Sequence, residues 1–383
     1  MFNIKTLNKI STIGLSQFDQ TKYTYADEIE NPDAILVRSA SMHDMQMPES
    51  LLAIARAGAG TNNIPCDTCA EQGIVVFNTP GANANAVKEL VLAGLFMSSR
   101  KVLAGIEWAK TLKGQGDEVG KLVEKGKSAF AGPEILGKTL GVLGLGAIGA
   151  MVADSAQKLG MNVIGYDPFT KLDDTNTFKQ VETLDEVWAE CDYISIHIPL
   201  NDKTKHTVNA ESIAKMKDGV RILNYARGGL VDSDALIKAL EDGKVAAYVV
   251  DFPDDKVLGV DGVIAIPHLG ASTPESEENC AYMAAKQVVA YLEEGSIINS
   301  VNMPNVKLGE INGVRTCVLH KNVPNTIAQI ATCFSNDGIN INKQINVSRG
   351  DYAYTVIDAD SINDNVVDAL SAMNETIKVR VIK

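Results

Sequence analysis

The sequence contains no uninterrupted apolar run long enough for a membrane-spanning helix, which needs about 20 such residues. Its first residues, Met1-Phe-Asn-Ile-Lys5, lack the charged start and apolar core of a signal peptide. These absences speak against a membrane partner and predict a cytoplasmic location.

An excess of positive charge is also missing. The 383 residues carry 48 acidic and 35 basic side chains, a net charge of −13, whereas proteins that bind nucleic acid usually present a basic face. We therefore expect no nucleic-acid partner. With 45% hydrophobic and 22% charged residues, the chain has the material for two or three globular cores.

Paired cysteine motifs are scarce. Six cysteines are scattered along the chain, and Cys66 and Cys69 form one Cys-x-x-Cys without the second pair that a zinc site needs. We predict no metal and interpret the cysteines as small buried residues. A redox pair at positions 66 and 69 is the alternative.

The chain does contain a glycine-rich nucleotide motif in a complete context. An apolar run from Gly137 leads into Gly144, Gly146 and Gly149, and the next apolar run ends at Asp167. The glycines allow a tight turn, close approach of a pyrophosphate and close helix packing, with the phosphates at the helix start. An acidic residue about 20 positions later binds the ribose 2′-hydroxyl and repels a 2′-phosphate. The motif predicts NAD as cofactor, rather than NADP.

Apolar runs of strand length alternate with helical patterns, which indicates a doubly wound α/β fold. The runs are 34–37, 74–77, 140–143, 163–166, 193–198, 220–223, 246–250 and 263–266. We expect the six runs from residue 140 onward to form one parallel sheet.

Two long helices are expected to join this nucleotide domain to the rest of the chain. One covers 85–113, and the other covers about 275–294, after Thr273-Pro274 and before Gly295. The predicted NAD-binding Rossmann domain is 98–286. It interrupts a flavodoxin-like substrate domain made of 1–97 and 287–308, and a cleft between two such domains is a common ligand site.

After Gly309 the pattern changes to a βαββαβ order, which is ferredoxin-like. We assign 313–383 to this third domain. It contains no acid–base cluster, so it is expected to bind a ligand or to mediate dimerisation.

Polar residues follow three apolar runs of the nucleotide domain, where the chemistry of such sheets is found. Arg227 could hold a carboxylate with its planar fork, and His268 could transfer a proton near neutral pH. Asp254 or Asp255 could orient that imidazole.

These motifs together resemble the D-isomer-specific 2-hydroxyacid dehydrogenases. The similar segments are 137–167, Asn-x-Ala-Arg-Gly-Gly-x-Val-Asp at 224–232, Pro-His-Leu-Gly-Ala-Ser-Thr at 267–273, and three segments in the first domain at 35–39, 56–60 and 78–81. The family usually has Asp-Val-Phe-x-x-Glu-Pro where this chain reads Asp251-Phe-Pro-Asp-Asp-Lys256. Allowing one deleted residue, Asp255 takes the place of the glutamate, with Asp254 as the alternative.

The resemblance implies hydride transfer from C2 of a 2-hydroxy acid, with 3-phosphoglycerate as the expected substrate. The implied catalytic residues are Arg227, Asp255 and His268. The implied cofactor-binding residues are Gly144, Gly146, Ala147, Ile148, Gly149, Asp167, Ile198, Pro199, Ala226, Asp251, Gly270 and Ala271. The implied substrate-binding residues are Arg38, Ser39, Arg56, Ala59 and Gly60.

The oligomeric states usual in this family imply a homodimer or a homotetramer. Two alternative functions stay open. One is a glyoxylate or hydroxypyruvate reductase, and the other is an NADH-sensing protein of the corepressor kind.

The last domain resembles an ACT regulatory domain. The resemblance implies that His320, Asn322 and Asn340 hold L-serine as an effector between paired domains, since amides and an imidazole can bind its ammonium and carboxylate. Many relatives have Pro-Gly where this chain has Pro324-Asn325, and asparagine also tolerates left-handed backbone. A domain that only dimerises is the alternative.

Overall fold

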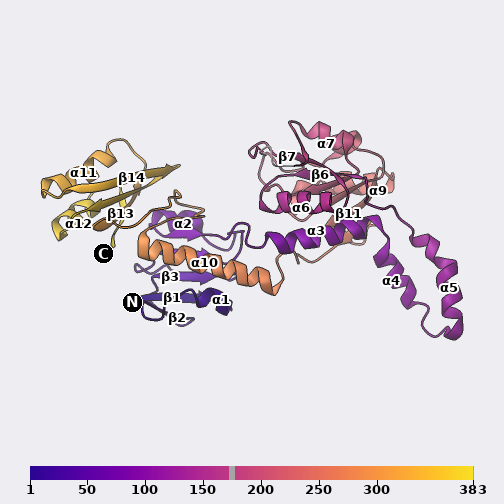
Figure 1. The fold of residues 1–383 in the computed structure, drawn as a ribbon, viewed down its shortest axis with the longest axis horizontal. Coiled ribbons are helices and arrows are strands. Elements are labelled where there is room, and N and C mark those ends of the chain that lie inside the picture. The colour runs from indigo at the N-terminus through magenta and orange to yellow at the C-terminus, as the bar shows by residue number, and fades with distance from the viewer. Residues whose placement is uncertain (172–176, 383) are drawn as a thin grey trace. The chain divides into compact units, whose positions relative to one another are not determined.

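The computed structural model describes the chain except for residues 172–176 and 383, and it contains two compact units (Figure 1). The first unit is Met1–Asn83 with Pro274–Lys383, and the second is Ala84–Thr273. Among the described residues, none of the helices is both long enough and apolar enough to span a bilayer.

The first unit contains a parallel five-stranded sheet. Its strands are β1 (Phe2–Leu7), β2 (Tyr23–Ala26), β3 (Ala34–Val37), β4 (Ala53–Arg56) and β5 (Val75–Phe77), in the order β2-β1-β3-β4-β5. This order confirms the flavodoxin-like prediction. The same unit contains the short helices α1 (Thr12–Leu15) and α2 (Cys66–Glu71). Strands β1, β2 and β4 were not among the predicted runs.

Helix α10 (Pro274–Glu294) packs against this sheet, as Figure 1 shows in orange. It has proline at its first position, and it ends where Gly295 adopts φ +77. The chain then returns to β5, where the amide of Val301 donates to the carbonyl of Val76. The first feature confirms the predicted second helix, but the chain is already in the first unit from Pro274, earlier than the return expected around 296–308.

The second unit contains a parallel seven-stranded sheet in the order β12-β11-β10-β9-β6-β7-β8. The strands are β6 (Thr139–Leu143), β7 (Asn162–Tyr166), β8 (Lys179–Val181), β9 (Tyr193–Ile196), β10 (Val220–Asn224), β11 (Val245–Val250) and β12 (Val263–Ala265). Its other helices include α6 (Ala147–Lys158), α7 (Leu184–Glu190), α8 (Ala210–Lys215), α9 (Ser233–Glu241) and the turn η3 (Gly228–Leu230). All six predicted strands are present, and β8 is an addition at one edge.

The single helix predicted over 85–113 is wrong. Helix α3 (Ala84–Ser99) stops, and α4 (Val102–Lys110) starts after a break at Arg100 and Lys101. The hydroxyls of Ser98 and Ser99 both donate to the carbonyl of Leu95, and such bonds compete with the helical ladder. The segment continues with η1 (Gly116–Glu118), α5 (Val119–Gly126) and η2 (Lys127–Phe130).

The C-terminal part of the first unit is a ferredoxin-like βαββαβ module, as predicted. Its antiparallel sheet has the order β14-β15-β13-β16. Its elements are β13 (Val314–Lys321), α11 (Thr326–Asn336), β14 (Ile341–Arg349), β15 (Tyr352–Ala359), α12 (Asp364–Ser371) and β16 (Thr376–Ile382). Asn325 precedes α11 at φ 71, so asparagine does supply the left-handed conformation there. Lys383, the last residue assigned to this module, lies outside the described residues.

The compact units divide the chain after Asn83 and after Thr273, whereas the sequence placed boundaries at 97/98 and 286/287. Helix α3 packs on α6, β10 and β11, and a Cβ at Gly94 would meet the hydroxyl of Tyr225 at 2.1 Å. Helix α10 packs on α1, β3 and β4, and a Cβ at Gly14 would meet the backbone of Ala281 at 2.6 Å. Each long helix therefore belongs wholly to one unit.

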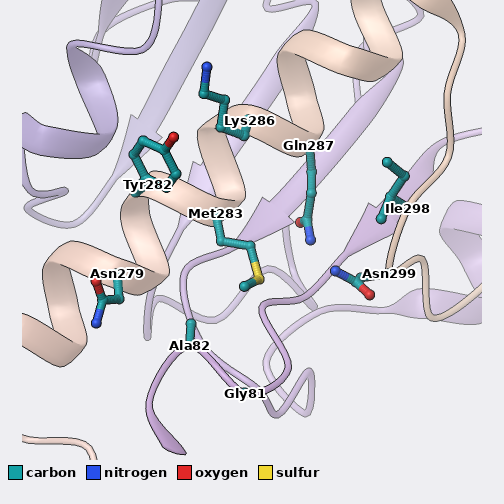
Figure 2. Close-up of a pocket in the computed structure, with 9 residues that line it drawn as sticks. All are labelled: Gly81, Ala82, Asn279, Tyr282, Met283, Lys286, Gln287, Ile298 and Asn299. Carbon is teal, nitrogen blue, oxygen red and sulfur yellow. The ribbon is translucent and has the colours of Figure 1, made fainter. Parts of the chain in front are cut away.

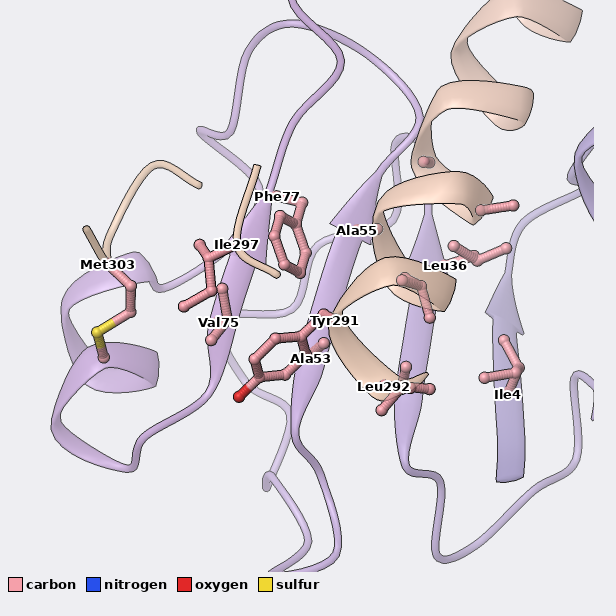
Figure 3. Packing of buried hydrophobic residues seen from close by; sticks show 14 of the residues in the cluster. Ile4, Leu36, Ala53, Ala55, Val75, Phe77, Tyr291, Leu292, Ile297 and Met303 are labelled. Carbon is pink, nitrogen blue, oxygen red and sulfur yellow. The ribbon is translucent and has the colours of Figure 1, made fainter. Parts of the chain in front are cut away.

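The C-terminal module holds the carboxyl end of α10. Arg315 donates to the carbonyl of Glu294, Arg380 to that of Leu292, and the Tyr354 hydroxyl to that of Gly295. These donors satisfy carbonyls that a helix end leaves without intrahelical partners. One apolar cluster runs from Ile4 and Leu36 through Tyr291 to residues of β13 and β15; Figure 3 shows its part between α10 and the first sheet.

The central donor, Arg315, is fully buried and forms a two-pronged ion pair with Asp358, at 2.7 Å and 2.8 Å. We predict that Arg315→Met alone lowers the free energy of unfolding by about 3–5 kcal/mol, because it leaves a buried carboxylate without its partner. Adding Asp358→Leu should recover the part of that loss that comes from the unpaired carboxylate, but not the part from the backbone carbonyls to which Arg315 donates. Urea unfolding of the single and double variants measures both effects.

The control is Lys238→Met, which breaks an exposed ion pair with Asp242 and should change stability by less than about 1 kcal/mol. An equal loss in the single and the double variant would contradict the role of the buried pair.

Candidate active site

The glycine turn after β6 has the shape that a dinucleotide requires. Gly144 has φ +89, and a Cβ at Gly149 would lie 1.9 Å from the carbonyl oxygen of Gly144. A Cβ added at Gly146 would have no atom within 4 Å other than those of its neighbours in the chain. The space beside the start of α6, at Ala147 and Ile148, is therefore open. Helix amides next to open space suit a pyrophosphate. These residues therefore fit the phosphates of a dinucleotide.

Asp167 stands at the end of β7, beside the glycine turn. Partial burial alone would raise its pKa, but hydrogen bonds from the amides of Leu145, Phe169 and Thr170 lower it overall. The carboxylate is thus ionised and held toward the turn, where it can accept a ribose hydroxyl and repel a 2′-phosphate.

Ile198 and Pro199 follow β9 on the other side of the turn. The preceding His197 is partly buried, which lowers its pKa to about 4, and its Nε2 lies 2.8 Å from the hydroxyl of Ser195. A Cβ at Gly144 would meet the carbonyl of His197 at 2.7 Å. This neutral histidine is therefore part of the wall behind the turn.

Arg227 and His268 both contact Phe252. The guanidinium carbon of Arg227 is 5.2 Å from the centre of the Phe252 ring, and the ring centres of Phe252 and His268 are 4.1 Å apart. All three follow strands of one sheet, β10, β11 and β12, at the carboxyl ends where such folds bind ligands.

The backbone around these side chains is fixed by polar contacts. Asn224, fully buried, donates from Nδ2 to the carbonyl of Arg227 and accepts from the amide of Ala226. The amide of His268 donates to the carbonyl of Asp251. The sequence did not predict that Phe252 contacts Arg227 and His268. Its position directly after Asp251, where the chain departs from the family motif, could have marked it as a site residue.

Asp251 is buried in the middle of this group. Burial raises its pKa to about 6, although nearby Arg227 acts in the opposite direction. Its Oδ1 has no hydrogen-bond partner, and its Oδ2 would be 3.4 Å from a Cβ at Gly270, the residue before Ala271. An unpaired buried acceptor at this place fits an amide donor such as the carboxamide of nicotinamide.

The two dyad candidates differ in their surroundings. Asp254 accepts from the hydroxyl of Ser233 at 2.6 Å and from the amide of Val257, so it is engaged at the start of α9. Asp255 is exposed beside it. The choice of Asp255 as the partner of His268 therefore stays a prediction.

The predicted substrate residues lie at strand ends of the first unit. Arg38 follows β3 and forms an ion pair with Glu277 of α10 at 2.6 Å, and Arg56 donates from Nε to the carbonyl of Arg38. The carbonyl of Ala59, next to Gly60, accepts from Asn78, and the amide of Ser39 donates to Asn8. The structure thus brings the two arginines together and reveals Glu277 as a partner that sequence analysis missed.

The predicted effector residues are not together within one chain. His320 is buried, with Nε2 at 2.8 Å from the hydroxyl of Thr355 and Nδ1 at 2.8 Å from the carbonyl of Lys321. Asn322 follows one end of β13, whereas Asn340 precedes β14 at the opposite end of the sheet. The length of β13, about 25 Å, separates them.

The cysteine pair is reduced. Cys66 and Cys69 are free thiols, and burial raises the pKa of both, to about 12 for Cys69. Because the thiolate is the reactive form, this supports small buried residues over a redox pair.

The family model for the D-isomer specific 2-hydroxyacid dehydrogenase, NAD binding domain, matches residues 93–270. A D-3-phosphoglycerate dehydrogenase of Haemophilus influenzae is 32% identical over 375 residues, which cover 93% of this chain and 88% of that protein. The chain belongs to the D-isomer specific 2-hydroxyacid dehydrogenase family. It therefore contains an NAD-binding domain of an oxidoreductase.

Two further relatives agree with this assignment. A D-3-phosphoglycerate dehydrogenase of Methanocaldococcus jannaschii is 35% identical over 322 residues, or 80% of this chain and 59% of that protein. The crystal structure of an NAD⁺-bound 3-phosphoglycerate dehydrogenase from Entamoeba histolytica has a TM-score of 0.61 at 26% identity, covering 79% of this chain and 98% of that one.

The raised pKa of Asp251 predicts how stability changes with pH. In the unfolded chain this carboxyl ionises near its usual pKa of 3.8, but in the folded protein near 6, so its ionisation destabilises the fold as pH rises through 6. We expect Asp251→Asn to stabilise the protein without cofactor by up to about 3 kcal/mol at about pH 8, and hardly at about pH 4.

Asp167→Asn is the matched control, because the pKa of Asp167 is lowered. That variant should be destabilised at about pH 8 and should approach the wild type at low pH. Urea unfolding at both pH values measures the two effects. A pH-independent gain in Asp251→Asn would contradict the buried-charge argument.

Proposed function

We propose that the chain is an NAD-dependent D-3-phosphoglycerate dehydrogenase, which oxidises 3-phospho-D-glycerate to 3-phosphohydroxypyruvate in the first step of L-serine biosynthesis. The observation that carries the proposal is the grouping of Arg227, Phe252 and His268 after strands of the parallel sheet whose strand β6 leads into the nucleotide turn. Relatives that this chain matches over most of its length bear that enzyme's name, which supports the choice of substrate.

Each residue has a defined task in this reaction. Arg227 binds the substrate carboxylate with its planar fork, and Phe252 holds the guanidinium and the imidazole in place. His268 takes the proton of the C2 hydroxyl while the hydride leaves C2. When bound, NAD supplies the hydride acceptor. Asp255, with Asp254 as the alternative, stabilises the imidazolium that forms.

The phosphate is assigned to the first unit. Arg38 and Arg56 are the cations there, with the loop that contains Ser39, Ala59 and Gly60. In an acidic protein a phosphate dianion needs such charges. Because Arg38 already pairs with Glu277, the phosphate would have to compete with that carboxylate.

We predict that His268→Ala lowers kcat by roughly two to four orders of magnitude with little change in NADH affinity, the usual effect of losing an acid–base group. The control is His206→Asn, an exposed histidine at φ 53 in the same unit, where asparagine tolerates the backbone. Steady-state kinetics and NADH fluorescence titration measure the two quantities. Near-normal turnover in His268→Ala would remove the assignment.

The Arg38–Glu277 ion pair favours one other enzyme class. If Glu277 neutralises Arg38, an unphosphorylated substrate suits the site, as in a glyoxylate or hydroxypyruvate reductase. Rates across phosphorylated and unphosphorylated 2-hydroxy and 2-keto acids separate the two classes. A protein that binds NADH but turns over none of these acids would instead be an NADH sensor of the corepressor kind.

We also propose a homodimer or homotetramer. None of the residues of α4 and α5 is buried, and several apolar side chains of this segment are exposed, including Val102, Leu103 and Ile106. Exposed apolar groups in such a segment suit an interface. Sedimentation velocity distinguishes these states from a monomer.

The C-terminal module is proposed as an ACT domain that binds L-serine through His320, Asn322 and Asn340. Since Asn322 and Asn340 lie at opposite ends of one sheet, a site that uses both needs two modules. The exposed edge strand β14 offers a place for the second copy.

We predict that L-serine inhibits the enzyme and that Asn340→Ala relieves the inhibition without changing uninhibited turnover, because the effector acts through its differential affinity for two arrangements. Asn336→Ala, an exposed residue at the end of α11, is the control. Activity assays with serine and calorimetry test this. Unchanged activity at millimolar serine together with no heat of binding would defeat the proposal.

A further inference from the structure

The first unit contains a cavity of about 470 Å³ that none of the predicted site residues lines. Figure 2 shows it between α10 and two loops, with Ala82 on one loop and Ile298 and Asn299 on the other. From α10 it is lined by Asn279, Tyr282, Met283, Lys286 and Gln287. Apart from Lys286, none of the lining side chains is ionisable near neutral pH.

Gln287 is the polar group of this cavity that is not satisfied. Only 5% of the residue is exposed, and neither Nε2 nor Oε1 has a hydrogen-bond partner. Figure 2 shows its amide extending from α10 toward the segment of Asn299, beside the thioether of Met283. An unpaired buried polar group costs about 1–3 kcal/mol, so a donor and an acceptor left open together need an explanation.

Asn299 forms the opposite wall. It has φ 58, a left-handed conformation that asparagine tolerates, and its carbonyl accepts from the amide of Asn78. This hydrogen bond ties the backbone of that wall to the loop after β5.

Lys286 is exposed, and its ammonium lies 5.8 Å from the centre of the Tyr282 ring. Gln287 is the buried polar residue of the lining, and its amide carries one donor group next to one acceptor. A carboxylate has only acceptors and would leave Oε1 unpaired, whereas a primary carboxamide satisfies both atoms with two parallel hydrogen bonds.

We propose that this cavity binds a small molecule that has a primary carboxamide on an apolar body. The carboxamide pairs with the Gln287 amide, and the apolar body lies against Met283 and Ile298, where a thioether favours an aromatic ring. The site lies outside the catalytic residues and does not depend on which substrate the enzyme oxidises.

Benzamide is the probe, and benzoate is its isosteric control without a donor. We expect benzamide to bind the full chain saturably with a Kd of roughly millimolar or tighter in calorimetry, as its size allows, and benzoate to bind at least tenfold more weakly. Gln287→Met keeps the volume and removes both polar atoms. It should weaken benzamide at least tenfold and should raise the thermal midpoint.

Two further variants keep the test decisive. Ala82→Leu reduces the cavity without touching Gln287 and should also weaken benzamide, whereas Gln344→Met, at an exposed position of β14, should not. All titrations are run with NADH at saturation, because benzamide resembles nicotinamide and could otherwise bind beside Asp251. Under that condition, no benzamide binding, equal affinity in wild type and Gln287→Met, or equal affinity for benzoate would each overturn the proposal. None of these outcomes depends on turnover, so failure here is distinct from failure of the proposed enzyme function.

Discussion

The carboxyl end of α10 is the constraint on which the first unit depends. A helix leaves its last carbonyls unsatisfied, and burying them without donors would cost free energy at each one. Here the donors come from a different module: Arg315, Arg380 and the hydroxyl of Tyr354. The guanidinium of Arg380 also lies 4.4 Å from the centre of the Tyr291 ring. The C-terminal module is therefore part of the hydrogen-bonding of α10, and the same helix carries Glu277, the partner of Arg38.

The second unit contains two aspartates whose environments shift their pKa values in opposite directions. Asp167 receives three backbone hydrogen bonds that hold its pKa low, so it carries a negative charge. Asp251 is buried with one oxygen unpaired, and its pKa rises to about 6. The first arrangement is satisfied before any ligand binds, whereas the second gains a partner only when a donor arrives. Burying an unpaired carboxylate at Asp251 costs free energy of folding. Strongly shifted pKa values of this kind are concentrated at functional sites, which is consistent with a ligand-binding role for Asp251.

Much of this architecture could be predicted from local sequence. The glycine turn, the six strands after residue 139 and the βαββαβ order all follow from apolar runs and turn residues. Strand β2 was missed because only Tyr23 of its four residues is buried, and β1 because only Ile4 of its six residues is buried, so their apolar patterns are weak. The break between α3 and α4 has no glycine or proline to mark it, because serine hydroxyls that bond to the backbone cause it.

The candidate site was predictable in its types of residue but not in its contacts. Arg227 and His268 stood out because each follows an apolar run, yet nothing local shows that both contact Phe252. Glu277 is even further from Arg38 along the chain, and only the packing of α10 on β3 brings them together. Contacts of this kind arise from tertiary structure, so periodicity and motif spacing carry no signal for them.

The geometry of the C-terminal module decides how the proposed serine site could be built. Asn322 and Asn340 are separated by the length of β13, about 25 Å, which no single amino acid can bridge. His320 already uses both ring nitrogens inside its own sheet, with the Thr355 hydroxyl bonded in turn to Asn346. A serine site built from these residues therefore has to be completed by a second copy of the chain. If that is so, a monomer cannot respond to serine, and serine binding must itself favour the paired state, because the two equilibria are linked.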